Sequence, residues 1–127
     1  MRRFFLTCSV LLPLVCSTFG CGTADPPVRR YHVRGLVKEV GGTGADLSIA
    51  IHHEVIPGFE DRDGKRSPMP SMVMAFGVAP DVPRDLWSQG AKVAIDFEVR
   101  WGRQPTLYIR RAEALGGDVL LSLSQGH

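Results

Sequence analysis

Alternating apolar and polar positions predict that this chain is built from β-strands. Residues 92–101 show the alternation most clearly, with an apolar side chain at every second position from Val93 to Trp101. Similar segments bounded by turn residues place four other strands at 31–40, 45–55, 71–79 and 106–115. Residues 81–87 predict one short helix between the third and fourth strands. Five strands and one short helix indicate an all-β fold, a small barrel, because closure removes exposed sheet edges.

The first 21 residues have the pattern of a secretory signal peptide. Arg2 and Arg3 precede an apolar run over residues 4–19, which is shorter than the roughly 20 apolar residues that a membrane span needs. Gly20 followed by Cys21 resembles a bacterial lipoprotein cleavage box, in which Cys21 would be lipidated. The alternative is an ordinary cleavable signal. Either form predicts a protein of the periplasm or cell envelope, with any contact to the membrane made through the lipid anchor.

Composition and charge of the remaining chain predict one domain. Residues 22–29 read as a tether, 30–116 as the barrel and 117–127 as a C-terminal tail. Loss of Arg2 and Arg3 reduces the 15 basic residues to 13, which equals the 13 acidic residues. A nucleic-acid partner is not indicated, because such surfaces show a strong basic excess.

All three cysteines lie within the predicted signal region. The mature domain therefore has no internal disulfide and no thiolate ligand. In an oxidising compartment thiols are drawn into disulfides, so methionine is the better soft donor there.

Two neighbouring strands place a histidine and two methionines at one end of the predicted core. On the second strand His53 shares the face of Ile51, and on the third Met72 and Met74 share the face of Phe76. Antiparallel pairing brings the end of one strand beside the start of the other. The sequence therefore predicts that one imidazole and two thioethers meet at the rim of the barrel.

This set of donors is selective for soft metal ions. Thioether sulfur suits Cu(I) and Ag(I) far better than zinc, magnesium or calcium. The structural alternative makes Met72 and Met74 core filler and His53 a capped histidine at a strand end. His52 faces the opposite side and is expected in solvent, and Glu54 is expected to be a surface charge.

The charged segment 60–68 separates the second strand from the third. A calcium loop centred on Gly64 would place Phe59 and Pro70 at ligand positions, so that motif fails. We expect a solvated, mobile loop that can be shortened.

Two stretches resemble the motif of the CusF-like family of periplasmic copper- and silver-binding proteins. They are Ile-His-His-Glu-Val-Ile at 51–56 and Met-Pro-Ser-Met-Val-Met-Ala-Phe at 69–76. The resemblance covers residues 31–115 and implies a five-stranded OB-like barrel, in agreement with the strand count. It also implies that His53 and the methionine pair bind Cu(I) or Ag(I), which family members pass to efflux machinery.

Two features depart from the best-known form of the family. Met69 stands where that form has a tryptophan packed over the metal by a cation–π contact. Some relatives carry methionine there after an Ile-Pro-Gly-Phe lead-in, present here at 56–59, so Met69 is a candidate fourth ligand. The second departure is segment 60–68, an insertion relative to that form.

The sequence is compatible with three functions. The first is a monomeric metallochaperone in copper efflux, homeostasis or oxidase assembly, with a periplasmic copper acceptor or efflux component as partner. The second is an OB-type module for a non-metal ligand, which predicts exposed aromatic residues on strands two and three. The third is a structural envelope lipoprotein. An enzyme is not indicated, because no arrangement of nucleophile and base is recognisable.

Overall fold

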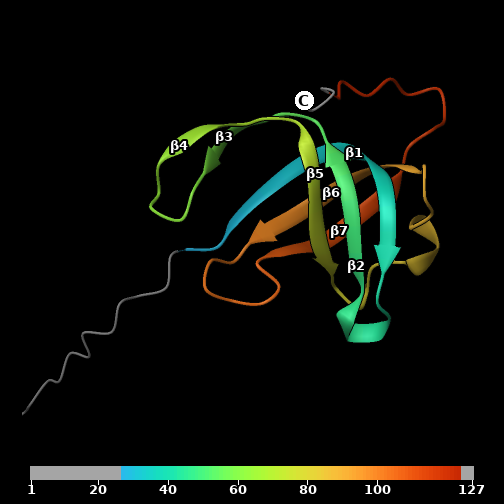
Figure 1. The fold of residues 1–127 in the computed structure, drawn as a ribbon, viewed down its shortest axis with the longest axis horizontal. Helices are drawn as coiled ribbons and strands as arrows, with labels where there is room; N and C mark the ends of the chain where they lie inside the picture. The colour runs from blue at the N-terminus through green and yellow to red at the C-terminus, as the bar shows by residue number, and fades with distance from the viewer. Residues whose placement is uncertain (1–26, 124–127) are drawn as a thin grey trace, which may run out of the picture.

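A computed structural model describes residues 27–123 of the protein, which form seven strands (Figure 1). The strands are β1 (Arg29–Gly41), β2 (Ser48–His53), β3 (Ile56–Glu60), β4 (Arg66–Met69), β5 (Met72–Val78), β6 (Lys92–Val99) and β7 (Leu107–Ala114). Two 3-10 turns, η1 (Gly44–Asp46) and η2 (Arg84–Leu86), precede β2 and β6. The predicted signal peptide at 1–21, its Cys21 and the end of the predicted tail lie outside the described residues.

Five of the strands close into a barrel in the order β1-β2-β5-β7-β6. The β1–β2, β2–β5, β6–β7 and β1–β6 pairs are antiparallel, and β5 closes the barrel by a short parallel pairing with β7. The prediction of a small five-stranded OB-like barrel is confirmed. Its strands are the predicted ones: β1 extends beyond its predicted bounds at both ends, and the other four are shorter than predicted.

The predicted helix between the third and fourth barrel strands is a single 3-10 turn, η2. Pro83 precedes it and the chain turns again at Gly90, whose φ of +88° belongs to the left-handed region that favours glycine. Of residues 84–89 between these two positions, only 84–86 form the turn. Trp87 follows η2 and is buried in the hydrophobic core.

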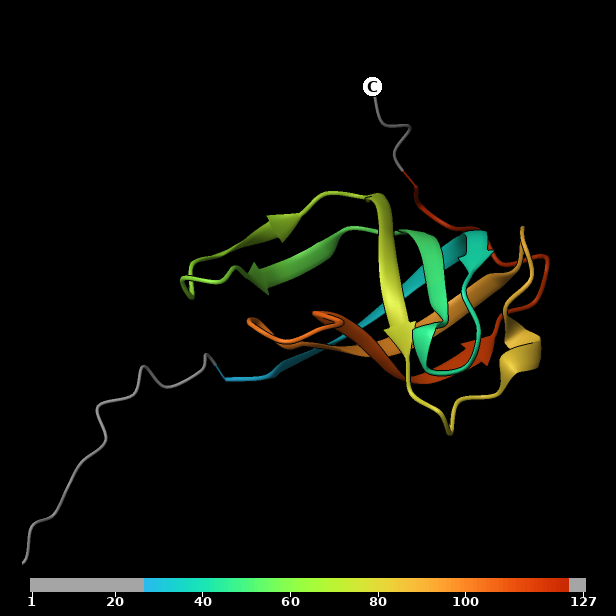
Figure 2. The ribbon, with the colours of Figure 1, turned by 60° about the horizontal axis from the view of Figure 1, so that its bottom comes forward.

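The prediction of a loop over 60–68 is wrong at both ends, because Glu60 belongs to β3 and residues 66–68 belong to β4. The two strands form a separate antiparallel ribbon that reaches away from the barrel (Figure 2). Residues 61–65 make the turn, in which Asp61 Oδ1 accepts hydrogen bonds from the backbone N–H groups of Asp63 and Lys65. The turn is exposed, as the charged sequence predicts.

The ribbon is fixed to the barrel by Phe59. This side chain is 6% exposed, and its ring lies 5.1 Å from the ring of Tyr31 on β1. The backbone N–H of Glu60 donates to the Tyr31 hydroxyl, and the Glu60 carboxylate pairs with Arg29. Apolar burial and these polar contacts override the strand-breaking residues Pro57 and Gly58.

The strand β1 pairs with both β2 and β6, and Gly35 lies where the two pairings overlap. A Cβ atom at this position would lie 2.5 Å from Ile51 Cγ2 and 2.8 Å from the His52 carbonyl oxygen. Only glycine lets β2 approach so closely, which explains why a glycine interrupts an otherwise regular strand.

The barrel interior is filled by the apolar residues that alternate along the strands. Phe76 and Phe97 meet edge to face at its centre, with ring centroids 5.0 Å apart. The buried cluster comprises Val33, Val37, Leu47, Ile49, Ile51, Ile56, Phe59, Phe76, Val78, Ala79, Val82, Trp87, Val93, Ile95, Phe97, Val99 and Ile109.

The start of the predicted C-terminal tail runs beside the barrel without regular structure. Lys92 Nζ donates hydrogen bonds to the carbonyl oxygens of Gly117 and Val119. The backbone N–H of Ser122 donates to Glu54, next to the end of β2. Within residues 27–123, no helical segment has the length and apolar character required to cross a bilayer.

Candidate metal centre

His53 is the last residue of β2, and its side chain is 0% exposed. Burial alternates strictly along β2, so Ile49, Ile51 and His53 all face the barrel interior. The sequence pattern predicted this orientation correctly. A fully buried imidazole needs polar partners, because an unpaired polar group inside a protein is costly.

Both ring nitrogens of His53 have a close neighbour. Nδ1 lies 2.6 Å from the carbonyl oxygen of Glu54, which can only accept, so Nδ1 carries the hydrogen. Nε2 lies 3.1 Å from Met74 Sδ. In the neutral ring, Nε2 therefore presents its lone pair to a sulfur atom that also bears lone pairs. This is the arrangement in which a cation is held between two donors.

Burial lowers the pKa of His53 below its usual value. The hydrogen bond to the Glu54 carbonyl opposes this effect, and the neighbouring His52 adds to it. The neutral form, which a metal ion requires, is therefore favoured near pH 7.

The two methionines of β5 lie on the rungs beside His53. Met72 is paired directly with His53, and Met74 with Ile51. Directly opposed residues of an antiparallel pair have Cβ atoms about 4.5–5.5 Å apart. Met74 packs partly against the core, whereas Met72 is 44% exposed. The structure thus brings His53, Met72 and Met74 together at the rim, with Met72 at the solvent side.

Met69 lies on the β3–β4 ribbon and is not paired with the strands that carry the other three residues. It ends β4, is paired with Ile56 and packs partly against the core. Two residues separate it from Met72, so it lies near the same end of β5. The pairing of the strands does not bring Met69 to His53, and its part in the site stays a prediction.

His52 lies on the outer face of β2, opposite Val73 of β5, and is partly exposed. This is the orientation predicted from alternation. Its imidazole therefore points away from the side of the sheet that carries His53.

Glu54 is not the plain surface charge that the sequence suggested. Its carboxylate accepts two hydrogen bonds from Arg34, at 2.8 and 2.9 Å, and one from the Ser122 backbone N–H. The hydrogen bond from Arg34 is the main reason that the pKa of Glu54 is lowered. These contacts hold the peptide that orients His53. The alternating pattern could not predict these contacts of Glu54, because the pattern of one strand does not show how that strand aligns with β1.

Within residues 27–123, no group of three or more His, Cys, Asp and Glu side chains is placed to hold a metal ion. The candidate centre is of another chemical kind, with one imidazole and thioether sulfur. Such a set fits a soft monovalent cation, which carries little charge into a partly buried position.

No protein-family model and no curated protein matches the sequence. Among solved structures, the chain is similar to apo-CusF from Escherichia coli, with 21% identity and a TM-score of 0.47, covering 78% of this chain and all of that one. It is also similar to Ag(I)CusF, with 22% identity and a TM-score of 0.47, over 71% of this chain and 100% of that one. This agrees with the resemblance expected from the sequence.

Proposed function

We propose that this protein binds one Cu(I) or Ag(I) ion at the rim of its barrel, through His53, Met72 and Met74. The observation that carries the proposal is the 3.1 Å approach of His53 Nε2 to Met74 Sδ, with Nδ1 engaged by the Glu54 carbonyl. Two atoms that each present a lone pair gain little from facing one another. A soft cation between them satisfies both.

The proposed ion is soft and monovalent because of what surrounds it. Thioethers bind Cu(I) and Ag(I) without releasing a proton, and the described domain contains no cysteine. His53 already has its hydrogen on Nδ1 and a lowered pKa, so little free energy is lost in deprotonating it.

A carrier must also release its ion, and the two methionines differ in the required way. Met74 is packed against the core, while Met72 is exposed beside His53. A donor on an acceptor protein can replace Met72 first, while His53 and Met74 still hold the ion. The function is therefore a metallochaperone rather than an enzyme.

The finer parts of the proposal follow from the sequence. We propose a periplasmic or envelope location, a lipid on Cys21, and an efflux component or copper acceptor as partner. Met69 is proposed as an additional donor that reaches the ion from β4.

A non-metal OB-type module has less support. The outward positions of β2 and β5 next to the site are Ala50, His52, Val73 and Ala75. None of these four is Phe, Tyr or Trp, and the imidazole of His52 is the one ring among them, so this face lacks the row of aromatic side chains that sugar or base recognition uses.

The test is metal stoichiometry on the copper-free protein. Native mass spectrometry under anaerobic conditions, with added Ag(I) or with Cu(I) held by a competing chelator, should show one ion per chain. Zinc at the same concentration should give no stable complex. Failure to bind both Cu(I) and Ag(I) would overturn the proposal.

A further inference from the structure

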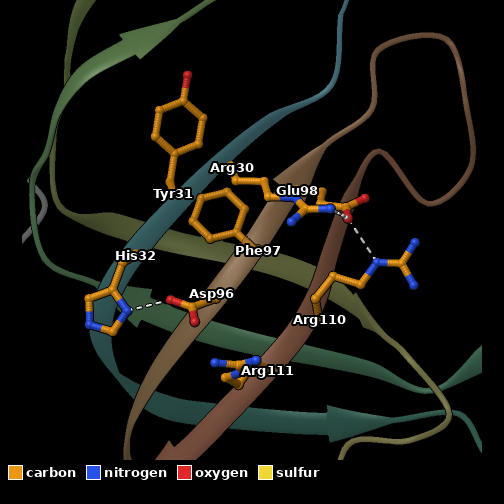
Figure 3. A pocket seen from close by; sticks show the side chains of 8 residues that line it. All are labelled: Arg30, Tyr31, His32, Asp96, Phe97, Glu98, Arg110 and Arg111. Carbon is orange, nitrogen blue, oxygen red and sulfur yellow. Dashed lines mark hydrogen bonds and ion pairs between the residues drawn. The ribbon is translucent and has the colours of Figure 1, made fainter.

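A second feature lies on the outer face of β1, β6 and β7, away from the methionine rim. Here a cavity of about 380 Å³ is lined by three arginines, one histidine and two carboxylates, besides Tyr31 and Phe97 (Figure 3). The arginines are Arg30 on β1 and Arg110 and Arg111 on β7. The proposed metal function uses none of these residues.

A β-bulge places two consecutive arginines on this one face. Asp96 of β6 is paired with Arg111 and Phe97 with Ile109, so Arg110 is an extra residue in β7. Without the bulge, neighbouring side chains would point to opposite faces. Ile109 is buried, while Arg110 and Arg111 are both exposed and both line the cavity. Bulges of this kind re-aim side chains and are enriched beside functional sites.

Arg110 is held in position from two sides. Its Nε donates to Glu98 Oε1 at 2.9 Å, and its guanidinium lies 4.8 Å from the centre of the Tyr108 ring. Glu98 is only 4% exposed and also faces Arg30, at 3.4 Å. Figure 3 shows the terminal amino groups of Arg110 directed away from Glu98. An arginine fixed in this way loses little conformational entropy when it binds an anion.

The cavity has more positive charge than its carboxylates neutralise. Glu98 balances one of the two arginines that face it. Asp96 accepts from His32 Nδ1, and within residues 27–123 no ion pair engages Arg111. Among the permanently charged side chains, three guanidinium groups face two carboxylates, which leaves a surplus of one positive charge.

We propose that this cavity binds a phosphate group. The free donors come from both sides of β6, that is from β1 and from β7, which lie about 9–10 Å apart across the sheet. A planar carboxylate is satisfied by one bidentate arginine, whereas a tetrahedral phosphate accepts from several guanidinium groups in different planes. A free phosphate ester and a phospholipid headgroup share this chemistry.

The experiment uses the copper-free protein at constant, low ionic strength, because screening weakens such contacts. Inorganic pyrophosphate, followed by calorimetry, probes soluble phosphate groups. Phosphatidylcholine vesicles with and without phosphatidylglycerol, followed by co-sedimentation, probe headgroups. A glutamate-rich peptide probes carboxylates. The variants are Arg110→Gln and Arg111→Gln, with Arg62→Gln on the ribbon turn as a control of equal charge.

We expect binding in at least one phosphate arm, lowered at least about tenfold by each cavity variant, as the loss of a charge-assisted hydrogen bond implies. Binding of pyrophosphate alone identifies a soluble phosphate ligand, and binding of vesicles alone identifies a headgroup. Arg111→Gln leaves the Glu98 contacts intact, so the test does not depend on the stability of the Arg110 variant. The proposal is overturned if neither arm binds, if Arg62→Gln weakens binding equally, or if the glutamate peptide binds as tightly.

Discussion

The imidazole of His53 and the thioether of Met74 face each other across β2 and β5, with Nε2 3.1 Å from Sδ. Thioether sulfur is a weak hydrogen-bond acceptor, and burial disfavours a second proton on the ring. The contact is therefore poor as a hydrogen bond and well suited to a soft cation. It links a buried nitrogen to a sulfur on the strand that also carries Met72.

Replacing Met74 by leucine should weaken Cu(I) binding at least about tenfold, since even loss of a partner outside the ligand shell commonly costs about that factor. Leucine conserves volume, so the barrel should lose less than ~1.5 kcal/mol of unfolding free energy. Chelator competition measures the affinity and urea unfolding the stability. Val73→Leu, on the outer face of β5, is the matched control and should bind like the parent.

Met72→Leu should also weaken binding at least about tenfold, with a smaller effect on stability because Met72 is 44% exposed. Met69→Leu should weaken it by a smaller factor, since its paired neighbour is Ile56. The same two measurements apply. Parent-like affinity in both Met72→Leu and Met74→Leu would remove the methionine pair from the site.

The affinity for Cu(I) should fall with pH in one step. A proton and the metal compete for His53 Nε2, and thioethers do not titrate in this range. Burial lowers the pKa of His53 below 6.5, so affinity should be flat above that pH. Below the lowered pKa it should fall about tenfold per pH unit, which is one proton per metal. Titrations between pH 5 and 8 measure the slope.

Two histidine variants assign that slope. His53→Met should keep soft-metal binding and flatten the pH dependence, because it replaces the titrating donor by another thioether. His52→Ala should shift the curve only slightly, since His52 points outward and is the weakest of the influences on His53. An unaltered slope in the His53 variant would exclude this residue as a ligand.

The copper-free protein should lose stability as the pH falls below about 6.5. The folded state keeps His53 neutral, while the unfolded chain takes up a proton there, so the unfolded state binds more protons and the free energy of unfolding decreases. The contribution of neutral His53 to the free energy of unfolding is complete above pH 6.5 and is lost as the pH approaches the lowered pKa of His53. Urea unfolding over this range should show this fall in the parent and its absence in His53→Met.

The ribbon should tolerate a shorter turn but not the loss of its anchor. Replacing residues 61–65 by Asn-Gly should cost about 1 kcal/mol or less, because loop length changes closure entropy slowly. Phe59→Ala should cost about 3–5 kcal/mol, since the ring is buried against Tyr31. Thermal unfolding compares the two. Equal stability of both variants would show that the ribbon is not packed as described.

The sequence predicted those features that depend on alternation within one strand. His53, Met72 and Met74 fall in phase with core residues, and the period of two fixes their orientation without knowledge of the neighbours. The five barrel strands were found for the same reason. The grouping of the three donors needed one further assumption, antiparallel pairing of β2 and β5, which is confirmed.

What the sequence did not predict depends on contacts between distant segments. Pro57 and Gly58 indicate a break, yet Phe59 reaches the core and Tyr31 fixes Glu60, so β3 forms. Glu54 gains its partners from β1 and the C-terminal segment. The shared face of Arg110 and Arg111 comes from a bulge, which alternation alone would have excluded.

The barrel is closed between β5 and β7 by two rungs only, at Gly77 and Val78. Within residues 27–123, the segment 72–76, which includes the proposed donors Met72 and Met74, therefore has a paired strand on one side, β2, and none on the other. Segments with few backbone partners open locally at small free-energy cost, well below that of global unfolding. An ion bound by His53 of β2 and the methionines of β5 would link the two strands at this weakly paired end. Metal loading should thus slow amide hydrogen exchange in residues 72–76 while leaving β1 and β6 unchanged. The bound ion would then stabilise the part of the barrel that lacks strand pairing.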